Sequence, residues 1–537
     1  MRSTIKIVIL LFFICTSMSG ASFPDMEKYM RQHALIWEQL PMQWNEGAFL
    51  GNGLVGMMVY ADSTLNALVF HLGRPDVTDH RKAPYRKTSI GTEEADKMVD
   101  FCRLDVGKML LFPEGKILSG TFYLDIYNAE LTGHLKTDKG DLTFHAYTPQ
   151  PEEVNIVEVS SGVPYRWKGI PGNPCSPRIR VFPHLKEKLK YKDNPAPVVN
   201  QKDKEGSWVQ SLLAGGDYAT YWKEVPGGKS RSVLYVSTAN EVPASSLSLA
   251  KAIKTVEAAQ ITGTKLLKQK TRQWWNAYHE RSFLSIPDKK LENFYFIQMY
   301  KLATCSHPDG PAMDVMGTFF KLSPWPSFWW NLNIQLTYMP IGPANRMEQG
   351  KNFQRLMDEV FPSLVRSIEP CKIGDYTWAL QNYYMYLRYA GADWQDIKQQ
   401  VVPKALDAFA VFDKILCYKE NTWHLTHIES PEYEGFQKYN DSNYGLASLS
   451  WLLQTLIACH DRTSSTHPDY ARWKEILTRL APYPTNENGL MIAANKPLEK
   501  SHRHYSHLLA FYPFRLLHPD VPENRKFLEK SIEHWLS

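Results

Sequence analysis

The feature that most constrains the fold of this chain is a change of sequence periodicity between residues 238 and 247. Before it, short runs such as GLVGMMVYA, GTFYLDIYNAEL and SRSVLYVST are rich in β-branched and aromatic residues and are separated by turn residues, which is typical of β-strands. After it, runs such as LSLAKAIKTVEAAQ and KLLKQKTRQWWNAYHERS repeat their apolar residues at helical spacing. Strands followed by helices predict a multidomain β + α protein.

The strand-rich part predicts a β-sandwich, because many short strands need a second sheet to cover their apolar faces. A stretch rich in Pro and Lys, residues 163–197, breaks the strand pattern, and we expect it to form a long insertion loop. We place the sandwich domain at residues 22–265. Residues 266–290 are expected to form a linker helix that leads into the second domain.

Residues 291–537 predict an all-helical domain of paired helices, since amphipathic segments alternate there with loops. Capping residues support several of these segments, for example Ser442 ahead of the run YGLASLSWLL. No sequence repeat recurs at a fixed period, which disfavours a solenoid. The expected helices span residues 291–305, 330–338, 346–367, 377–391, 394–416, 443–460, 467–481, 504–511 and 522–536.

The first 21 residues predict a signal peptide, because basic residues precede an apolar run from Ile7 to Ile14 and small residues follow it up to Ala21. This run is short for a membrane-spanning helix, and no later run reaches the required length. We therefore expect no membrane insertion after cleavage. The predicted location is periplasmic or extracellular, and surface lipid anchoring at Cys15 is left open.

Charge and cysteine usage exclude several classes of function. The formal net charge is +5 at pH 7, and Lys and Arg are not clustered as they are in proteins that bind nucleic acid. The cysteines beyond the signal peptide are scattered without CxxC spacing, so neither a zinc site nor a redox motif is indicated. No cofactor and no nucleic-acid partner are predicted.

The run WHLTHIESPEYEG, residues 423–435, places Glu429, Glu432 and Glu434 beside two histidines. A carboxyl among other carboxyls and aromatic rings tends to stay protonated, because negative neighbours and desolvation both disfavour its charge. A neutral carboxyl can donate a proton near pH 7. Pro431 fixes the backbone before Glu432, so we expect a shaped catalytic loop. The alternative is an acidic, solvated loop between helices.

A second candidate site lies in PWPSFWWNLNIQLTY, residues 324–338, where Asn331 and Asn333 follow Trp330. In an extended turn both amides can point into one pocket, where carboxamides hold a water molecule or sugar hydroxyls by hydrogen bonds. Trp330 is a candidate to contact substrate there. The alternative is an Asn that caps a helix and a Trp that belongs to the core.

A third candidate is SHRHYSHLLAFYP, residues 501–513, which holds His502, Arg503, His504 and His507. Imidazoles are common ligands of transition metals. However, neither an acid nor a Cys follows at ligand spacing, and the Arg503 cation would repel a metal ion. Hydrogen bonding to a neutral polyol is therefore favoured over metal binding, and a polar loop that caps a following helix remains the alternative.

The segments LGNGLVGMMVY, WWNLNIQLTYMP, SPEYEG and SHRHYSHLLAFYP occur in an order and at a spacing that resemble glycoside hydrolase family 95. The resemblance extends over nearly the whole chain. It implies a β-sandwich, a helical linker and an (α/α)6 six-hairpin barrel at residues 291–537. A complete barrel needs more helices than the segments above supply, so the resemblance implies a barrel that is incomplete at its C-terminal end.

The resemblance also implies roles for single residues. Glu432 corresponds to the general acid, Asn331 and Asn333 to the groups that hold the attacking water, and the cluster from His502 to His507 to sugar contacts. In the family, an acid ahead of the HRHYSHL run activates the water. Here that stretch is GLMIAANKPLEKS, whose only acid is Glu499, which makes Glu499 the candidate base.

Known members of the family include α-L-fucosidases and α-L-galactosidases. The resemblance therefore implies an exported, inverting exo-glycosidase that acts on terminal α-L-fucosyl or α-L-galactosyl residues of an oligosaccharide or polysaccharide. The segment HLGRPDVTDHR, residues 71–81, is closer to a divergent subgroup of the family. Two other classes stay open: a non-catalytic glycan-binding relative, and a polysaccharide lyase on a similar helical toroid with Tyr505 as its base.

Overall fold

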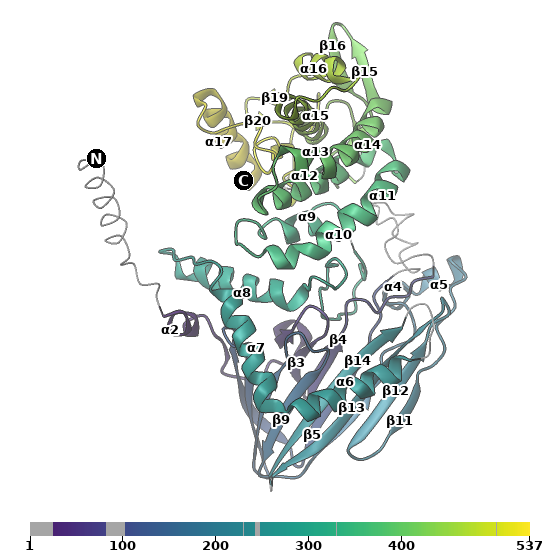
Figure 1. Cartoon of the computed structure of the whole chain (residues 1–537), viewed down its shortest axis with the longest axis vertical. Coiled ribbons are helices and arrows are strands. Elements are labelled where there is room, and N and C mark those ends of the chain that lie inside the picture. Colours follow the sequence, from purple (N-terminus) through teal and green to yellow (C-terminus); the bar gives the residue numbers. More distant parts are fainter. Residues whose placement is uncertain are drawn as a thin grey trace, which may run out of the picture.

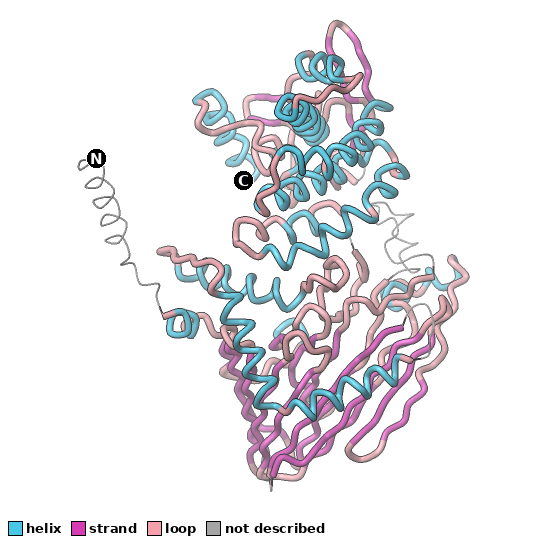
Figure 2. Tube along the Cα trace, in the orientation of Figure 1, coloured by secondary structure: helices cyan, strands magenta, loops and turns pink. Residues whose placement is uncertain are grey.

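The computed structural model describes residues 25–81, 102–228, 230–241, 247–328, 330–435, 437–500 and 502–537. Strands occupy the first part of the chain and helices the second, as Figures 1 and 2 show. The predicted signal peptide lies outside the described residues. Among the helices that the structure describes, none combines the length and the apolar character needed to cross a bilayer.

The larger of the two sheets in the first part of the chain begins at the edge strand β1 and has the order β1-β6-β7-β8-β9-β14-β13-β12-β11. Its central strands β8 and β9 pair Phe144 with Val159, and apolar residues alternate with polar ones along them. The strands span β1 (Leu35–Trp37), β6 (Ile117–Asp125), β7 (Glu130–Thr137), β8 (Asp141–Tyr147), β9 (Asn155–Ser161), β14 (Arg231–Glu241), β13 (Asp217–Gly228), β12 (Glu205–Ser211) and β11 (Val198–Gln201).

The smaller sheet covers the apolar face of the larger one and has the order β10-β5-β4-β3-β2. Phe70 of the smaller sheet meets Phe144 of the larger one edge to face, with ring centroids 5.5 Å apart, and both rings are buried. The predicted β-sandwich is thus confirmed. The strands span β10 (Tyr165–Ile170), β5 (Lys108–Pro113), β4 (Ala67–Gly73), β3 (Gly56–Asp62) and β2 (Ala48–Gly51).

The expectation that residues 163–197 form a long loop is wrong. This stretch contributes strand β10 and two short helices, α4 (Pro177–Val181) and α5 (His184–Lys188). Trp167 explains the strand, because its side chain is buried in the sandwich core against Phe70. The buried Tyr191 hydroxyl donates to Asp79 at 2.9 Å and so fastens the end of the stretch to the sandwich.

Two helices connect the sandwich to the helical part. Helix α6 (Ser248–Thr262) lies along β13 and β14, and α7 (Thr264–His279) then runs from the sandwich toward α8 (Lys289–Cys305) (Figure 1). Trp275 of α7 and Tyr300 of α8 pack together in the sandwich core, with ring centroids 4.9 Å apart. The start of the helical domain is therefore anchored in the sandwich. Helix α2 (Met26–Arg31) also contributes to this core.

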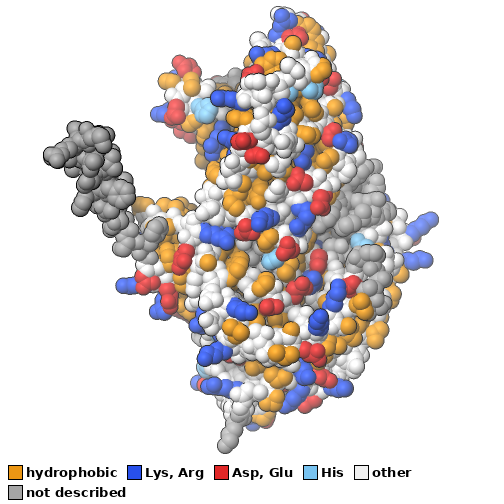
Figure 3. All heavy atoms as spheres, in the orientation of Figure 1, with side chains coloured by type: hydrophobic (Ala, Val, Ile, Leu, Met, Phe, Trp, Pro, Cys, Tyr) orange, Lys and Arg blue, Asp and Glu red, His pale blue; other side chains and the backbone are white. Residues whose placement is uncertain are grey.

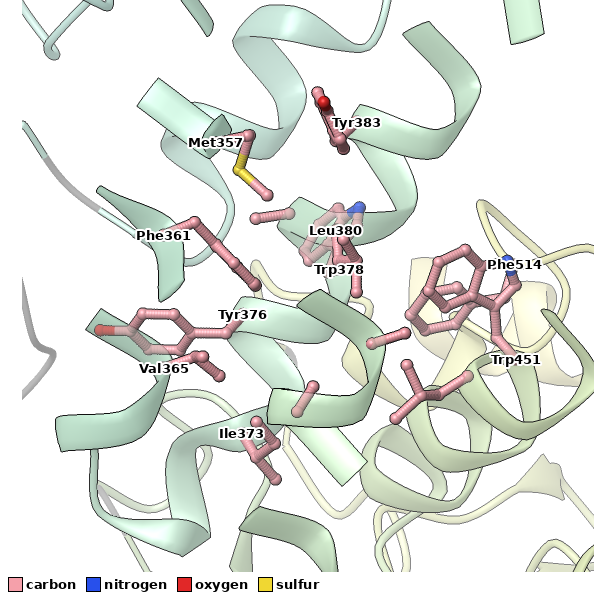
Figure 4. Close-up of a cluster of buried hydrophobic side chains, with 14 of the residues drawn as sticks. Met357, Phe361, Val365, Ile373, Tyr376, Trp378, Leu380, Tyr383, Trp451 and Phe514 are labelled. Atoms are coloured by element: carbon pink, nitrogen blue, oxygen red, sulfur yellow. The ribbon is translucent and has the colours of Figure 1, made fainter. Parts of the chain in front are cut away.

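The rest of the helical domain is built around α12 and α15, which are buried on nearly all sides. Figure 4 shows side chains of this core, among them Met357, Trp378 and Trp451. The helices span α9 (Asn333–Tyr338), α10 (Lys351–Glu359), α11 (Phe361–Ser367), α12 (Ile373–Tyr389), α13 (Trp394–Gln400), α14 (Val402–Phe412), α15 (Asn443–Thr463), α16 (Tyr470–Thr478) and α17 (Pro522–Leu536).

Three expected helices differ from the observed ones. The segments 346–367 and 394–416 each divide into two helices, because Pro362 and Pro403 stand in the first turn of α11 and α14. Proline fits a first helical turn but breaks a continuing helix. The expected helix 504–511 contains only a short 3-10 turn at Ser506–Leu508.

Candidate active site

Three sequence motifs that lie far apart in the chain meet at one small cavity in the helical domain. Its volume is about 10 Å³, which is room for about one water molecule. The NLN motif, the SPEYEG loop and the HRHYSHL run all contribute to its wall. The lining residues are Asn331, Leu332, Trp378, Pro431, Tyr444, His504, Tyr505, Ser506 and Leu509.

A short hairpin carries the acidic loop to this cavity. Strand β17 (Ile428–Glu429) pairs with β18 (Lys438–Tyr439), and the chain between them turns sharply, with a φ of 55° at Glu432. The loop is fastened to the opposite motif, since the Ser430 and Ser506 hydroxyl oxygens lie 2.8 Å apart. Nε2 of His502 lies 3.0 Å from the carbonyl oxygen of Pro431. A non-glycine residue with positive φ is uncommon and marks a constrained position.

Glu432 is ionised at neutral pH in this structure, contrary to the expectation of a protonated carboxyl. His504, whose Nε2 lies 3.4 Å from the carboxylate, and Arg503, which forms an ion pair with it, hold the pKa of Glu432 below its ordinary value. The loop carboxyls are not crowded, because Glu434 turns outward and binds Lys496 at 2.9 Å. Glu429 is the loop carboxyl whose pKa is raised, and burial is the main cause.

Asn331 and Asn333 do not share a pocket, so the expectation that both amides point into one is wrong. Asn331 and Leu332 both have left-handed backbones, with φ of 59° and 58°, in place of an extended turn. As a result Asn331 is buried at the small cavity. Asn333 is exposed at the start of α9 and lines a separate cleft of about 950 Å³ beside α8.

The side-chain amide of Asn331 has a fixed orientation. Its Nδ2 donates to Oδ1 of Asp375 at 2.6 Å. Its own Oδ1 is buried and has no hydrogen-bond partner within the described part of the chain. A buried acceptor without a protein partner suits a site that binds a water molecule or a substrate hydroxyl.

Trp330 belongs to the core, which corrects its assignment as a substrate contact. Its side chain is 0% exposed. It packs edge to face on Phe328, with ring centroids 5.0 Å apart, and against Tyr376 at 5.5 Å. A ring enclosed in this way has no face left for a sugar.

Of the three histidines in this cluster, only His504 lines the cavity. His502 stacks on His504 with ring centroids 5.1 Å apart, and His504 and Arg503 both approach Glu432. His507 is buried, and burial lowers its pKa to about 4, which keeps the ring neutral at physiological pH. Among the described residues, no group of three or more His, Cys, Asp and Glu side chains is arranged to hold a metal ion.

Glu499, the candidate base, does not line the cavity. Its side chain is exposed and its carboxylate binds Lys496 at 2.7 Å. Its backbone N–H donates to the Tyr433 hydroxyl at 2.8 Å. The residue therefore lies on the outer side of the acidic loop.

Asp375 is a candidate site residue that sequence reasoning missed. It lies in the first turn of α12, is 3% exposed, and accepts hydrogen bonds at one oxygen, Oδ1, from Asn331 and from the Tyr444 hydroxyl. Burial raises its pKa to about 7. An acidic residue inside the otherwise uncharged run IGDYTWALQNYYMYL is the sequence signal that could have identified it.

Comparison with known families identifies a domain in the second part of the chain. Residues 371–536 match the model of the glycosyl hydrolase family 95 catalytic domain. The matched region contains α12, α15, the acidic loop and the HRHYSHL run, whereas Asn331 precedes it. The expected resemblance to family 95 is thereby confirmed for this region. None of the curated proteins compared matches the chain.

One solved structure shares the fold with little sequence identity, and two others resemble the chain more loosely. A putative kojibiose phosphorylase from human microbiome has a TM-score of 0.55 and 9% identity, over 83% of this chain and 67% of that one. A bacterial glucoamylase complexed with acarbose has a TM-score of 0.45 and 8% identity, over 83% and 69%. A family GH92 α-mannosidase from Bacteroides thetaiotaomicron in complex with mannoimidazole has a TM-score of 0.35 and 9% identity, over 80% and 61%.

These comparisons settle the fold class. The chain is a β-sandwich followed by a helical domain of the (α/α)6-barrel type, and it spans about two thirds of the length of the kojibiose phosphorylase structure it resembles. Together with the family match, this fold supports a glycoside hydrolase. The expectation that the barrel is incomplete stays a prediction.

Proposed function

We propose that this protein hydrolyses terminal α-L-fucosyl or α-L-galactosyl residues of an oligosaccharide or polysaccharide, with inversion at the anomeric carbon. The observation that carries this proposal is the meeting of Asn331, the Glu432 loop and His504 around one cavity. Two of these three elements lie in the region that matches the family 95 catalytic domain. The specificity follows from the family resemblance.

The proposed acid is Glu432, which must gain a proton before it can protonate the leaving oxygen. In the free protein its ion pair with Arg503 favours the charged form. The Arg503 side chain is 72% exposed, so a substrate that covers Glu432 can displace it. Loss of the cation and of water both raise a carboxyl pKa, which prepares Glu432 to donate.

The attacking water is proposed to lie at the small cavity, where Asn331 Oδ1 accepts one of its hydrogen bonds. A volume of about 10 Å³ admits a water molecule but not a sugar ring. The sugar must then lie on the solvent side, next to Glu432 and Arg503. Acid and water on opposite faces of the sugar is the arrangement that inverts, and the water must pass its proton to a base about 6.5–9.5 Å from the acid. Asn331 orients the water and takes no proton, and the base is left unassigned because Glu499 lies outside the cavity wall.

A polysaccharide lyase fits the site less well. Its base would be Tyr505, but burial raises the pKa of Tyr505 to about 12, so this phenol is protonated at neutral pH. Hydrolysis is therefore the better assignment.

Export to the periplasm or the extracellular space is part of the proposal and rests on the sequence of residues 1–21. Fractionation of cells that express the full chain tests it. Recovery of the processed chain outside the cytoplasm is expected, and an unprocessed cytoplasmic chain would contradict export.

The decisive test of function is a screen of the purified chain against α-L-fucosides and α-L-galactosides, with mass spectrometry of the products. Hydrolysis adds one water, elimination leaves an unsaturated sugar end, and a binding protein does neither. Early NMR spectra of a cleaved α-glycoside should show the β anomer first. A first-formed α anomer would exclude inversion and the water site at Asn331.

A further inference from the structure

Asp375 lies directly behind Asn331, on the side away from the cavity. Asn331 Nδ2 donates to Asp375 Oδ1 at 2.6 Å, and the Tyr444 hydroxyl donates to the same oxygen at 2.5 Å. Asn331 and Tyr444 both line the cavity, whereas Asp375 does not. One buried carboxyl oxygen therefore holds two parts of the cavity wall.

The packing of α12 against α15 makes this arrangement possible. At Gly374, an added Cβ would lie 2.2 Å from the Tyr444 ring, so only a glycine lets the ring approach α12 so closely. The approach brings the Tyr444 hydroxyl to Asp375. A second link joins α12 to α9, since Gln335 Nε2 donates to the backbone carbonyl of Asp375 at 2.9 Å.

We propose that Asp375 is a positioning residue for hydrolysis: it selects the orientation of the Asn331 carboxamide that turns Oδ1 toward the attacking water. The proposal rests on the hydrolytic function proposed above. It assigns to Asp375 no contact with substrate and no proton transfer. Its whole effect passes through Asn331, with Tyr444 as a second anchor.

The chemistry of the two side chains explains the selection. A carboxamide has one donor end and one acceptor end, whereas Oδ1 of Asp375 serves here as an acceptor. The donor end of Asn331 must therefore face Asp375, which leaves the buried acceptor end, without a partner among the described residues, to receive the water. The opposite orientation would place two acceptor oxygens against each other and would turn the NH2 group toward the water.

Backbone geometry gives a second reason why Asn331 needs such an anchor. Asn331 and Leu332 both hold left-handed conformations, with φ of 59° and 58°. Residues of this kind persist only where their surroundings fix them. The hydrogen bond to Asp375 fixes the side chain of Asn331 at this strained turn.

The charged and titratable groups near Asp375 are consistent with an acceptor role. Tyr444 from α15, Glu429 from the acidic loop and Lys372 from the start of α12 act on it in addition to Asn331. Burial outweighs these partners and raises its pKa to about 7. Because Oδ1 alone accepts both hydrogen bonds, the neutral acid can keep them with its proton on Oδ2.

The test compares Asp375→Asn, which keeps an oxygen acceptor, with Asp375→Leu, which removes it at similar volume. Asp375→Leu should lower kcat by roughly 10- to 100-fold, because a misplaced water-holding group costs about that much. KM should stay within about threefold, since substrate binding is not the affected step. Asp375→Asn should recover most of kcat. Asp407→Leu, which breaks an exposed ion pair with Arg366 on the same domain, is the matched control.

A double-mutant cycle separates positioning from a general structural role. If Asp375 acts through Asn331, Asp375→Leu should add little to the loss caused by Asn331→Ala, whereas independent effects would multiply. Tyr444→Phe keeps the fold and removes one anchor, so it should lower kcat by roughly 2- to 10-fold. This variant keeps the proposal testable if Asp375→Leu does not fold.

The outcomes are distinguishable from failure of the proposed function. A wild-type chain that cleaves its glycoside while Asp375→Leu or Tyr444→Phe keeps full kcat overturns the positioning role alone. Multiplying losses in the cycle overturn it as well. A wild-type chain that cleaves no glycoside overturns both the function and the role of Asp375.

Discussion

The pKa values of buried carboxyl groups shift in opposite directions in the sandwich and at the cavity of the helical domain. In the sandwich, Glu130 accepts from Arg272 and from His145, at 2.8 Å and 2.9 Å. Burial would raise its pKa, but these two partners hold it at about 2. Arg74 likewise pairs with Asp76 and Glu153. Surface charges of both signs are also interspersed on the face shown in Figure 3.

At the cavity, Asp375 accepts hydrogen bonds from neutral groups, and burial raises its pKa to about 7. The pKa of the nearby Glu429 is raised as well, while the pKa of Glu432, which lies next to the cavity residue Pro431, is lowered. Neighbouring carboxyls whose pKa values are pushed apart are characteristic of functional sites. In the sandwich, ion pairs therefore keep the buried carboxylate charged and stabilise the fold. At the cavity, the buried carboxyl Asp375 has a pKa near neutral pH and can change its protonation state.

The largest expected effect is the loss of activity when the proposed acid, Glu432, can no longer donate a proton. Glu432→Gln removes the transferable proton and keeps the shape, so hydrolysis of an unactivated glycoside should fall by about 10²–10⁴-fold. Initial rates measure the loss of hydrolysis, and the affinity for the sugar shows whether the shape of the site is kept. Glu434→Gln is the control, because Glu434 points outward to Lys496. A loss below tenfold in Glu432→Gln would remove Glu432 from the role of acid.

The second prediction concerns the pH dependence of stability at the cavity. The pKa of Asp375 rises from its ordinary 3.8 to about 7 on folding, so the stability from its protonated form is complete below pH 3.8 and is lost as pH rises through 7. At about 1.4 kcal/mol per pH unit, the loss is roughly 4 kcal/mol. Urea unfolding from pH 4 to 8 should show a flatter profile for Asp375→Asn. Equal slopes in both proteins would exclude a protonated Asp375.

The third prediction concerns the opposite pH dependence of stability, which is expected for Glu130 in the sandwich. The pKa of Glu130 falls from 4.5 to about 2 on folding, so its contribution is present above pH 4.5 and is lost as pH falls through 2. Solvent around the half-exposed Arg272 screens the ion pair and limits this contribution to about 1 kcal/mol. Glu130→Gln should therefore be less stable than wild type at pH 7 and nearly equal to it at pH 2. A difference that persists at pH 2 would contradict the assignment.

Periodicity and turn residues predicted the layered fold, because they are local properties. A common site for the three motifs was implied only by the resemblance to family 95. The position of Asn331, the acidic loop and the HRHYSHL run at one cavity agrees with this expectation. Side-chain direction was less predictable. Asn333 points away because two left-handed residues precede α9, and Trp330 is enclosed by rings from other segments.

The site electrostatics could not be read from the sequence. Glu432 lies among acidic residues in the chain, yet its nearest partners in space are Arg503 and His504, which are about seventy residues away. Asp375 looks like one acidic residue in a buried helix. Its importance depends on Asn331 and Tyr444, which reach it from opposite directions along the chain.

The smallest expected effect concerns the ion pair between Arg503 and Glu432. Arg503→Gln removes a cation from Glu432, so the pKa of Glu432 should rise. The protonated acid is the active form, and activity is lost as pH rises through this pKa. The alkaline limb of the pH–rate profile should therefore move to higher pH, while the rate at the optimum stays within about threefold, because exposed ion pairs contribute little.

Lys438→Gln is the matched control for Arg503→Gln, since Lys438 is an exposed cation on the same hairpin that faces Glu369 instead of Glu432. Its pH–rate profile should keep the wild-type alkaline limb. If Arg503→Gln leaves the alkaline limb in place and moves the acidic limb to higher pH, the charged form of Glu432 is the active one, and the residue acts as a base. In that case the buried acid Asp375, with its pKa of about 7, would become the carboxyl to test as proton donor.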